Sequence, residues 1–297
     1  MNSIEKALLR KQADSKKDEL QKTEADEISS LEQQAELKQT ASLDEPNEIN
    51  SPSFIQIDLE KLEAKGFVAN SSTSSRKLIN EEYRAIKRKV LNNAFGPLSK
   101  SLNNSNIIMV TSSRPSEGKT FTAVNLALSI ALEKDKTVLL VDADVLKPNV
   151  MRTLELKNQE GLMEYLLGEK TDISEVMCNT NVPNLRIIPA GKSHHLSTEL
   201  LASEKMSQAV EEFANRYPDR VVIVDTPPLL GINETAILAN LAGQAIVVTE
   251  ENKSKLIDVQ KAVAHLSPDM AIGFVVNKSQ SSNKDGTGYG YYYAGNN

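Results

Sequence analysis

The chain has 297 residues, a single cysteine and a net charge of −6, and the charge is uneven: residues 1–75 hold 9 Lys/Arg against 15 Asp/Glu. This balance argues against nucleic acid as a partner, and one cysteine excludes an internal disulfide framework and fits the reducing cytosol. No apolar run approaches the ~20 residues of a membrane span and no signal-peptide core is present, so we expect a cytoplasmic protein.

Residues 1–54 are rich in Glu, Lys, Gln and Ser and contain no aromatic residue before Phe54. Ile4, Leu8 and Leu9 allow one short amphipathic helix. The remainder has too little apolar surface to offset the entropy of ordering, so we predict a mostly disordered, acidic N-terminal region. Residues 55–278 are predicted to form the main domain.

That domain is predicted to begin with a helical extension over residues 55–100. A Ser/Thr-rich linker at 70–75 separates a first strand or turn and helix from a second helix at 77–91. Glu81, Arg84 and Lys87 lie at i, i+3 and i+6 of this second helix, and we expect them to share one charged face. Such a face is either an assembly surface or simply solvated.

From Asn106 onward, apolar strands and helices alternate regularly. Runs such as 138–141 and 221–224 are continuously apolar, which is typical of parallel strands covered on both faces. The pattern predicts strands at 107–111, 137–142, 185–189, 220–225, 244–249 and 271–276, and helices at 119–133, 203–216, 233–241 and 254–266. The predicted fold is α/β, a doubly wound, mostly parallel sheet with helices on both faces and ligands at the carboxyl ends of the strands.

Residues 107–120 combine a strand, a polar loop and a helix start. Four apolar residues precede the loop, and Gly118-Lys119-Thr120 opens an apolar-periodic helix. A phosphate-binding loop has this layout, in which loop N–H groups and the helix N-terminus favour an anion. The lysine would reach the β- and γ-phosphates and the threonine hydroxyl would bind Mg²⁺. Ser113 stands where the usual motif has its first glycine, so only the second half of the motif matches.

Carboxylates follow two other apolar strands. Asp142 and Asp144 come at the end of one, and Asp225 ends another. Carboxylates at such positions can support a Mg²⁺ shell, and one can accept a proton from an incoming hydroxyl. A single strand-end Asp is often only a turn or cap, but three of them with the loop predict nucleotide hydrolysis or transfer that depends on Mg²⁺.

Residues 279–297 depart from the α/β pattern. They are polar and Gly-rich, which predicts a flexible tail. Four of the seven tyrosines of the chain fall there, namely Tyr289, Tyr291, Tyr292 and Tyr293. Asn277, just after the last strand, either reads the adenine edge or ends the strand in a turn.

These features together resemble the bacterial tyrosine kinases, which have a P-loop ATPase fold. The similarity rests on the loop at 112–120, Asp142-x-Asp144, Asp225-Thr226-Pro227-Pro228 and the tyrosine-rich tail. Residues 81–87 resemble the family's Glu-x-x-Arg-x-x-Arg oligomerisation motif. Residues 57–67 and 82–88 are similar to the exosortase-associated tyrosine autokinases of exopolysaccharide clusters. Leu146 stands where the family has an arginine, and Lys147 comes next.

The resemblance implies the role of each site residue. Lys119 would bind and polarise the phosphates of the cofactor ATP, while Thr120 and Asp225 hold Mg²⁺. Asp142 and Asp144 would share metal support and proton acceptance, in an order that the sequence leaves open. The residues expected to contact the nucleotide are Ser113, Pro115, Ser116, Glu117, Gly118, Lys119, Thr120, Phe121 and Asn277.

The resemblance also implies partners. A tail tyrosine would enter the active site of a neighbouring subunit, which requires a homo-oligomer, expected to be a ring assembled through Glu81, Arg84 and Lys87. A separate transmembrane chain-length-determinant protein would activate the enzyme and recruit it to the inner membrane, and a cognate tyrosine phosphatase would reverse the reaction. The process would be exopolysaccharide or capsular polysaccharide synthesis and export.

Two alternatives share the predicted fold. One is a nucleotide-switched ATPase of the partition or septum-positioning type, although Arg114, Pro115 and Ser116 stand where those proteins carry a lysine and two glycines. The other is a scaffold that binds ATP only to assemble.

Overall fold

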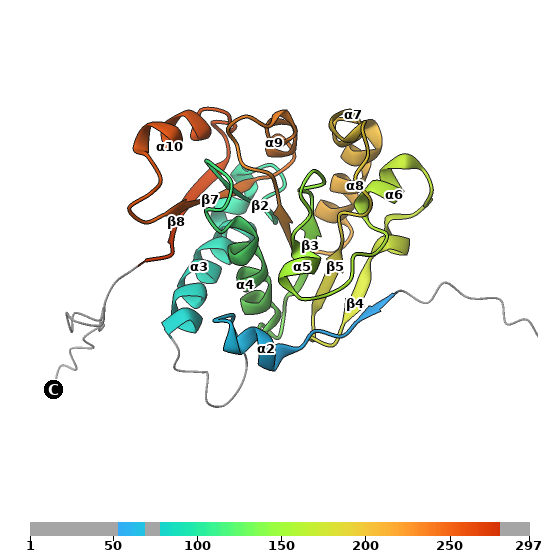
Figure 1. Cartoon of the computed structure of the whole chain (residues 1–297), viewed down its shortest axis with the longest axis horizontal. Coiled ribbons are helices and arrows are strands. Elements are labelled where there is room, and N and C mark those ends of the chain that lie inside the picture. The colour runs from blue at the N-terminus through green and yellow to red at the C-terminus, as the bar shows by residue number, and fades with distance from the viewer. Residues whose placement is uncertain (1–52, 69–77, 280–297) are drawn as a thin grey trace, which may run out of the picture. The chain divides into compact units, whose positions relative to one another are not determined.

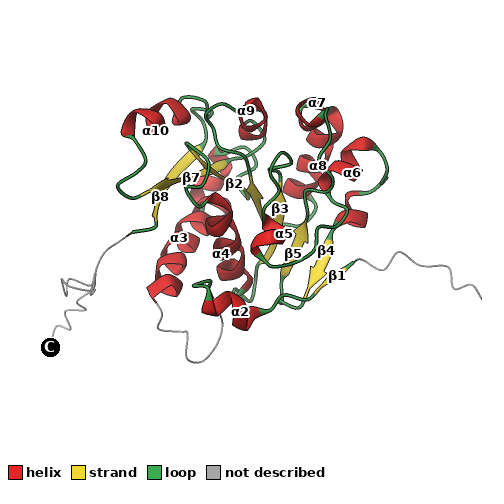
Figure 2. Cartoon of the chain, viewed as in Figure 1, coloured by secondary structure: helices red, strands yellow, loops and turns green. Residues whose placement is uncertain are grey.

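The computed structural model describes residues 53–68 and 78–279. Its strands form one sheet in the order β1-β4-β5-β3-β6-β2-β7-β8 (Figures 1 and 2). Neighbouring strands are parallel except for β4 and β5. The strands are β1 Phe54–Ile55, β2 Ile107–Ser112, β3 Thr137–Asp142, β4 Cys178–Thr180, β5 Leu185–Ile188, β6 Arg220–Asp225, β7 Gln244–Glu250 and β8 Ala271–Asn277. The predicted α/β fold and its six strands are confirmed, and Phe54, placed at the end of the predicted N-terminal region, belongs to β1. Residues 1–52, the linker at 70–75 and residues 280–297 with the tyrosine cluster lie outside the described residues.

Helices connect most of these strands. They are α2 Leu59–Ala64, α3 Leu78–Phe95, α4 Lys119–Ala131, α5 Val150–Thr153, α6 Leu162–Leu167, α7 Ser197–Leu201, α8 Glu204–Asn215, α9 Asn233–Ala239 and α10 Leu256–Val263, with short 3-10 helices at Pro97–Ser101 and Ile173–Val176. All five helices predicted from periodicity are present within a few residues of their expected ends. No helix of the described residues is long and apolar enough to cross a bilayer.

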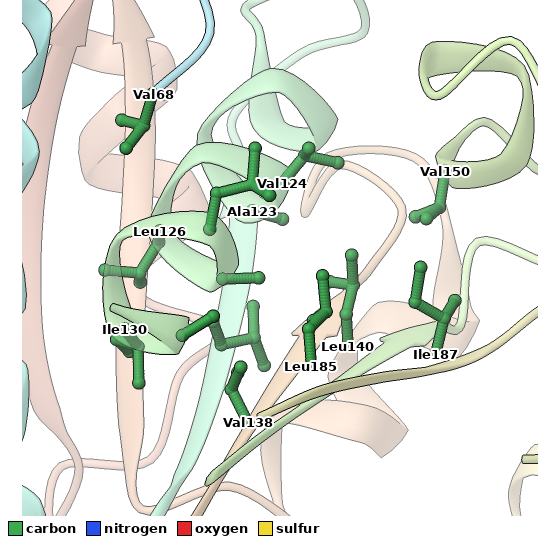
Figure 3. Close-up of a cluster of buried hydrophobic side chains, with 14 of the residues drawn as sticks. Val68, Ala123, Val124, Leu126, Ile130, Val138, Leu140, Val150, Leu185 and Ile187 are labelled. Carbon is green, nitrogen blue, oxygen red and sulfur yellow. The ribbon is translucent and has the colours of Figure 1, made fainter. Parts of the chain in front are cut away.

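Alternate residues of the central strands build separate cores on the two faces of the sheet. Ile108 and Val110 of β2 pack in a cluster with residues of α3 and α4, and Figure 3 shows Val138 and Leu140 of β3 beside α4 in the same cluster. Ile107, on the opposite face of β2, packs with α6 and α8. Because successive side chains of a strand point to opposite faces, continuously apolar strands require helices on both sides.

The edge formed by β1 and β4 was only partly predicted. β4 is a three-residue, mostly polar strand that runs antiparallel to β5, and it pairs with the two residues of β1. Asn181 fastens this edge, because its side chain accepts from the N–H of Ile57 at 2.7 Å and donates to the carbonyl of Ile57 at 2.9 Å. Strands this short carry no periodic signal, and their pairing joins segments more than 120 residues apart.

The structure corrects the prediction that Glu81, Arg84 and Lys87 share one charged face. Glu81 and Arg84 are exposed and form an ion pair with each other. Lys87 is buried instead, since its Nζ donates to the carbonyl of Ser129 at 3.0 Å and lies 2.6 Å from a carboxylate oxygen of Glu133. Lys87 therefore holds α3 against the C-terminal end of α4, where a cation is favoured by the helix dipole.

Candidate active site

The predicted site residues meet at the carboxyl ends of adjacent parallel strands. β6 lies between β2 and β3, and its last residue, Asp225, is in register with Asp142 of β3 and with Val110 of β2. The loop after β2 leads directly into α4, so the strand register alone brings the loop and the strand-end carboxylates to one edge of the sheet. This is the edge at which doubly wound sheets bind their ligands.

Lys119 lies at the centre of a buried network of charges. Its Nζ donates to Asp144 Oδ2 at 2.6 Å and lies 3.8 Å from Asp225 Oδ1. The hydroxyl of Thr120 donates to the other oxygen of Asp225 at 2.6 Å. The structure thus brings together four of the residues that were predicted to act on phosphate and metal.

The two carboxylates after β3 occupy different environments. Asp142 is fully buried and accepts backbone N–H groups from Asp144 at 3.2 Å, Asn149 at 3.0 Å and Val150 at 2.9 Å. Asp144 lines the pocket beside Lys119 and accepts one backbone N–H, from Lys147 at 3.1 Å. The first carboxylate therefore shapes the loop that follows β3, while the second faces the space in which a ligand would bind.

The serine that replaces the first glycine of the loop has a partner of its own. The Ser113 hydroxyl lies 2.9 and 3.0 Å from the two carboxylate oxygens of Glu117, which also accepts the N–H of Arg114 at 2.8 Å and the hydroxyl of Ser254. Ser113 and Glu117 are both buried and belong to the support of the loop rather than to the pocket lining. The serine at the position of the first glycine therefore does not occupy the pocket in which phosphate would bind.

Asn277 approaches the loop from β8. Its side-chain amide donates to the carbonyl of Glu117 at 3.0 Å. A Cβ at position 118 would lie only 1.8 Å from the same amide nitrogen, and Gly118 has a φ of +102°, so this position favours glycine for two reasons. The predicted contact of Asn277 with adenine stays a prediction.

A pocket of about 480 Å³ opens above the loop. Among the predicted nucleotide contacts, Pro115, Ser116, Gly118, Lys119, Thr120 and Phe121 line it, together with Asp144. The rest of the lining was not predicted to contact the nucleotide and consists of Leu146, Lys147, Asn149, Arg152, Thr153, Pro228 and Ile232. Most of these residues belong to α5 and the loop before it, and a four-residue helix gives no periodic signal. Leu146, Lys147 and Pro228 stood out in the sequence, but not as pocket residues.

Burial and mutual repulsion set the charge state of the carboxylates. Burial, and then the nearby charge of Asp225, raise the pKa of Asp142 to about 7. Burial also raises the pKa of Asp225, to about 6, although Lys119 and the Thr120 hydroxyl oppose the rise. Burial lowers the pKa of Lys119, but the carboxylates of Asp225 and Asp144 outweigh it and hold that pKa above its usual value.

The residues present fit a magnesium ion with a nucleotide. Asp225 Oδ1 is buried and accepts no hydrogen bond from the described residues, although the Lys119 ammonium lies 3.8 Å away. A carboxylate oxygen that accepts no hydrogen bond, next to a threonine hydroxyl, is a hard oxygen donor set. No cluster of three or more His, Cys, Asp or Glu within residues 53–68 and 78–279 forms a complete metal cage. Mg²⁺ at phosphoryl-transfer sites needs none, because substrate phosphates and water complete its shell.

Comparisons with known proteins assign this site to a family. The family described as AAA domain matches residues 105–265. The tyrosine-protein kinase YwqD of Bacillus subtilis is 32% identical over 222 residues, which cover 74% of this chain and 89% of YwqD. The chain belongs to the bacterial tyrosine-protein kinase family. It is thus a protein-tyrosine kinase, and its P-loop fold implies nucleotide binding with Mg²⁺ in general.

Two further comparisons bear on this kinase. The tyrosine-protein kinase ptk of Acinetobacter johnsonii is 32% identical over 179 residues, but these cover 60% of this kinase and only 24% of ptk. The kinase domain of Escherichia coli tyrosine kinase ETK superposes with a TM-score of 0.60 at 24% identity, covering 80% of this kinase and 94% of that domain, which shows the shared fold. The family membership favours the kinase over the positioning-ATPase and scaffold alternatives.

Proposed function

We propose that this kinase transfers the γ-phosphoryl group of ATP to the tyrosine cluster at its own C-terminus, from one copy of the chain to another. The accessibility of the tyrosines carries the proposal. Tyr83 and Tyr165 are buried, at 4% and 6% exposure. Tyr217 is half-buried, with the Arg220 guanidinium 3.7 Å from its ring centre. The other four tyrosines are those of residues 289–293.

The tail has the reach and the chemistry of a substrate. It leaves the sheet at Asn277, and the 14 residues to Tyr291 span up to about 45–50 Å when extended, enough to reach an adjacent subunit. Residues 279–297 contain one Lys and one Asp, so each phosphate would change a neutral segment by about −1.5 to −2 charges. Several phosphates would repel the acidic site and one another, and would thereby release the tail and loosen the oligomer.

The geometry supports a division of labour among the site residues. Bound ATP and Mg²⁺ would supply the transferable phosphoryl group and neutralise the charge that develops on it. Thr120 and the Oδ1 oxygen of Asp225 would hold the metal, and Lys119 would leave Asp144 for the phosphates. Asp144, freed of its cation and facing the pocket, would then accept the proton of the tyrosine hydroxyl. Asp142, with three backbone N–H groups on its oxygens, would fix the loop that carries Asp144.

A mixture of two full-length variants tests transfer between copies. Lys119→Met with an intact tail serves as substrate, and a chain with Tyr289, Tyr291, Tyr292 and Tyr293 changed to Phe serves as enzyme. We expect phosphotyrosine on the Lys119→Met chain only in the mixture with Mg²⁺ and ATP. Absence of phosphate in the mixture, with wild-type protein labelled normally, would contradict transfer between copies.

The structure divides the proposed assembly motif into two parts, which gives a prediction. We expect Glu81→Ala with Arg84→Ala to lower the oligomer mass in light scattering without moving the unfolding temperature, since both side chains are about half exposed. Lys87→Ala should instead destabilise the fold by about 1–3 kcal/mol, because it leaves the buried carbonyl of Ser129 without its donor. Lys89→Ala, an exposed change on the same helix, is the control. An unchanged oligomer mass in the double variant would mean that Glu81 and Arg84 form a solvated ion pair with no part in assembly.

The remaining proposals concern partners. The match to ptk leaves three quarters of that protein without a counterpart in this sequence. We propose a transmembrane chain-length-determinant protein in that role, a cognate tyrosine phosphatase, recruitment of a cytoplasmic kinase to the inner membrane, and control of exopolysaccharide or capsular polysaccharide synthesis and export. Purification of the tagged kinase from membranes, followed by identification of co-purifying proteins, tests the partners.

A further inference from the structure

The last strand of the sheet has an open outer edge. β8 ends the strand order, and within the described part of the chain it pairs with β7 alone. Its residues, Ala-Ile-Gly-Phe-Val-Val-Asn, include no charge and no proline. Edge strands present unpaired N–H and C=O groups, and proteins usually protect such an edge with Lys, Pro or a covering element. β8 carries neither protecting residue type, and it therefore suits the addition of another strand.

Both faces of β8 are also apolar and incompletely covered. Ile272 packs on the side of the sheet occupied by α10, and Phe274 and Val276, which share its face by alternation, are 56% and 62% exposed. On the other face, a groove of about 440 Å³ lies between α3 and the last two strands, with Ile86 and Val275 in its lining. A strand added at this edge would have apolar surface available to side chains on both of its faces.

The chain outside the described residues begins at the end of this strand. The Asn277 amide bonds to the carbonyl of Glu117, and Lys278 Nζ donates to the carbonyl of Ser116 at 2.8 Å. Lys278 also has a left-handed backbone, with a φ of +56°, which is a conformation typical of turns. The tail therefore starts from a fixed point, with a turn conformation, directly beside the open edge.

We propose that residues 289–294 of the same chain add to the outer edge of β8 as an antiparallel strand. The ten residues 279–288 are long enough to return the chain along the edge. In a strand, Tyr289, Tyr291 and Tyr293 would share one face and Tyr292 would occupy the other, so either register places aromatic rings both beside Phe274 and in the groove. The backbone supplies the pairing and the aromatic side chains supply the apolar contact, as in strand addition generally.

Docking on β8 would keep the tyrosines away from any active site. Phosphorylation would release the docked strand, because charged phosphates cannot pack on Phe274 and Val276. The docked strand itself does not depend on kinase activity. Only this effect on phosphorylation rests on the proposed function, so the docked strand and its effect on phosphorylation are tested separately.

Hydrogen exchange measured by mass spectrometry tests the docked strand on the full-length, unphosphorylated Lys119→Met protein without nucleotide. We expect amides of residues 289–294 to exchange at least about tenfold more slowly than those of 280–287, at any protein concentration. Prolines at Gly290 and Tyr291 should abolish this protection, because adjacent N–H groups of a strand point to opposite edges and one of the pair must face β8. Prolines at Gly286 and Thr287 are the matched control and should leave it unchanged.

Two results would overturn the proposal. Equal exchange in the two segments would mean that no strand forms, and protection that rises with protein concentration would assign the edge to a second copy. In otherwise active protein, Phe274→Ser should raise the initial rate of autophosphorylation by releasing the tail, with the unfolding temperature kept because this side chain is largely exposed. An unchanged or lower rate would contradict storage of the tyrosines even where the exchange protection is found.

Discussion

Lys119→Met is expected to lower the rate of tyrosine phosphorylation by about 10²–10³-fold or more, the range typical of removing one preorganised group that stabilises developing charge. The Nζ of Lys119 stands between Asp144, at 2.6 Å, and Asp225, at 3.8 Å. It is the cation at the start of α4, where the loop and the helix N-terminus favour phosphate. Phosphotyrosine quantified by mass spectrometry over time, with and without Mg²⁺ and ATP, measures the effect.

The fold should survive this change. Methionine keeps the length of the side chain, and the carboxylates left without a cation can take up protons, since burial already raises the pKa of Asp225 to about 6. Lys134→Met, an exposed change just beyond the other end of α4, is the matched control and should keep full activity. Normal phosphorylation by a folded Lys119→Met protein would show that Lys119 does not bind the transferred phosphate.

Asp225→Asn is expected to shift the magnesium dependence of the kinase to much higher Mg²⁺ concentrations. The Oδ1 of Asp225, which accepts no hydrogen bond from the described residues, and the Thr120 hydroxyl on its Oδ2 form the proposed metal position. Loss of the charge should raise the Mg²⁺ concentration for half-maximal activity by at least about 10- to 100-fold, as even indirect supports of a metal ligand do. Activity against Mg²⁺ concentration gives the measurement, with the exposed Asp135→Asn as control. An unchanged magnesium curve would make Asp225 a strand-end cap.

The stability of Asp225→Asn relative to wild type is also expected to depend on pH. The folded-state pKa of Asp225 is raised from 3.8 to about 6, so between about pH 4 and pH 6 the folded protein binds a proton that the unfolded chain has already lost. Ligand-free wild-type stability from this group therefore falls as the pH rises through that window. Asparagine cannot ionise, so the unfolding temperature of Asp225→Asn relative to wild type should increase over the same window. If the difference in unfolding temperature between Asp225→Asn and wild type stays constant over this window, the pKa of Asp225 in the folded protein is not raised into it.

Most of the sheet could be predicted because its signals are local. The runs at 138–141 and 221–224 fixed two buried strands, and the step from strand to polar loop to Gly118-Lys119-Thr120 fixed the phosphate loop. Once these strands are parallel neighbours, their last residues must meet, and Asp142 and Asp225 are indeed in register. The core of the candidate site thus followed from strand ends and sheet topology.

What escaped prediction depends on contacts distant in sequence or on the backbone. Lys87 looked like part of a charged stripe, and only the approach of Glu133 and Ser129 shows that it is buried. The three backbone N–H groups on Asp142 come from a loop whose course the sequence does not reveal. Most of the remaining pocket lining lies on α5 and the loop before it, and α5 is too short for a periodic pattern. The role of Ser113 became clear only with its contact to Glu117.

The central claim is that the kinase phosphorylates its own tyrosine tail, and mapping of the modified tyrosines tests it most directly. The purified full-length protein would be incubated with Mg²⁺ and ATP, digested and analysed by mass spectrometry, with Lys119→Met as the blank. The account predicts that most of the phosphate lies within residues 289–293. Phosphate found mainly on Tyr83, Tyr165 or Tyr217, the tyrosines that the fold covers, would contradict it.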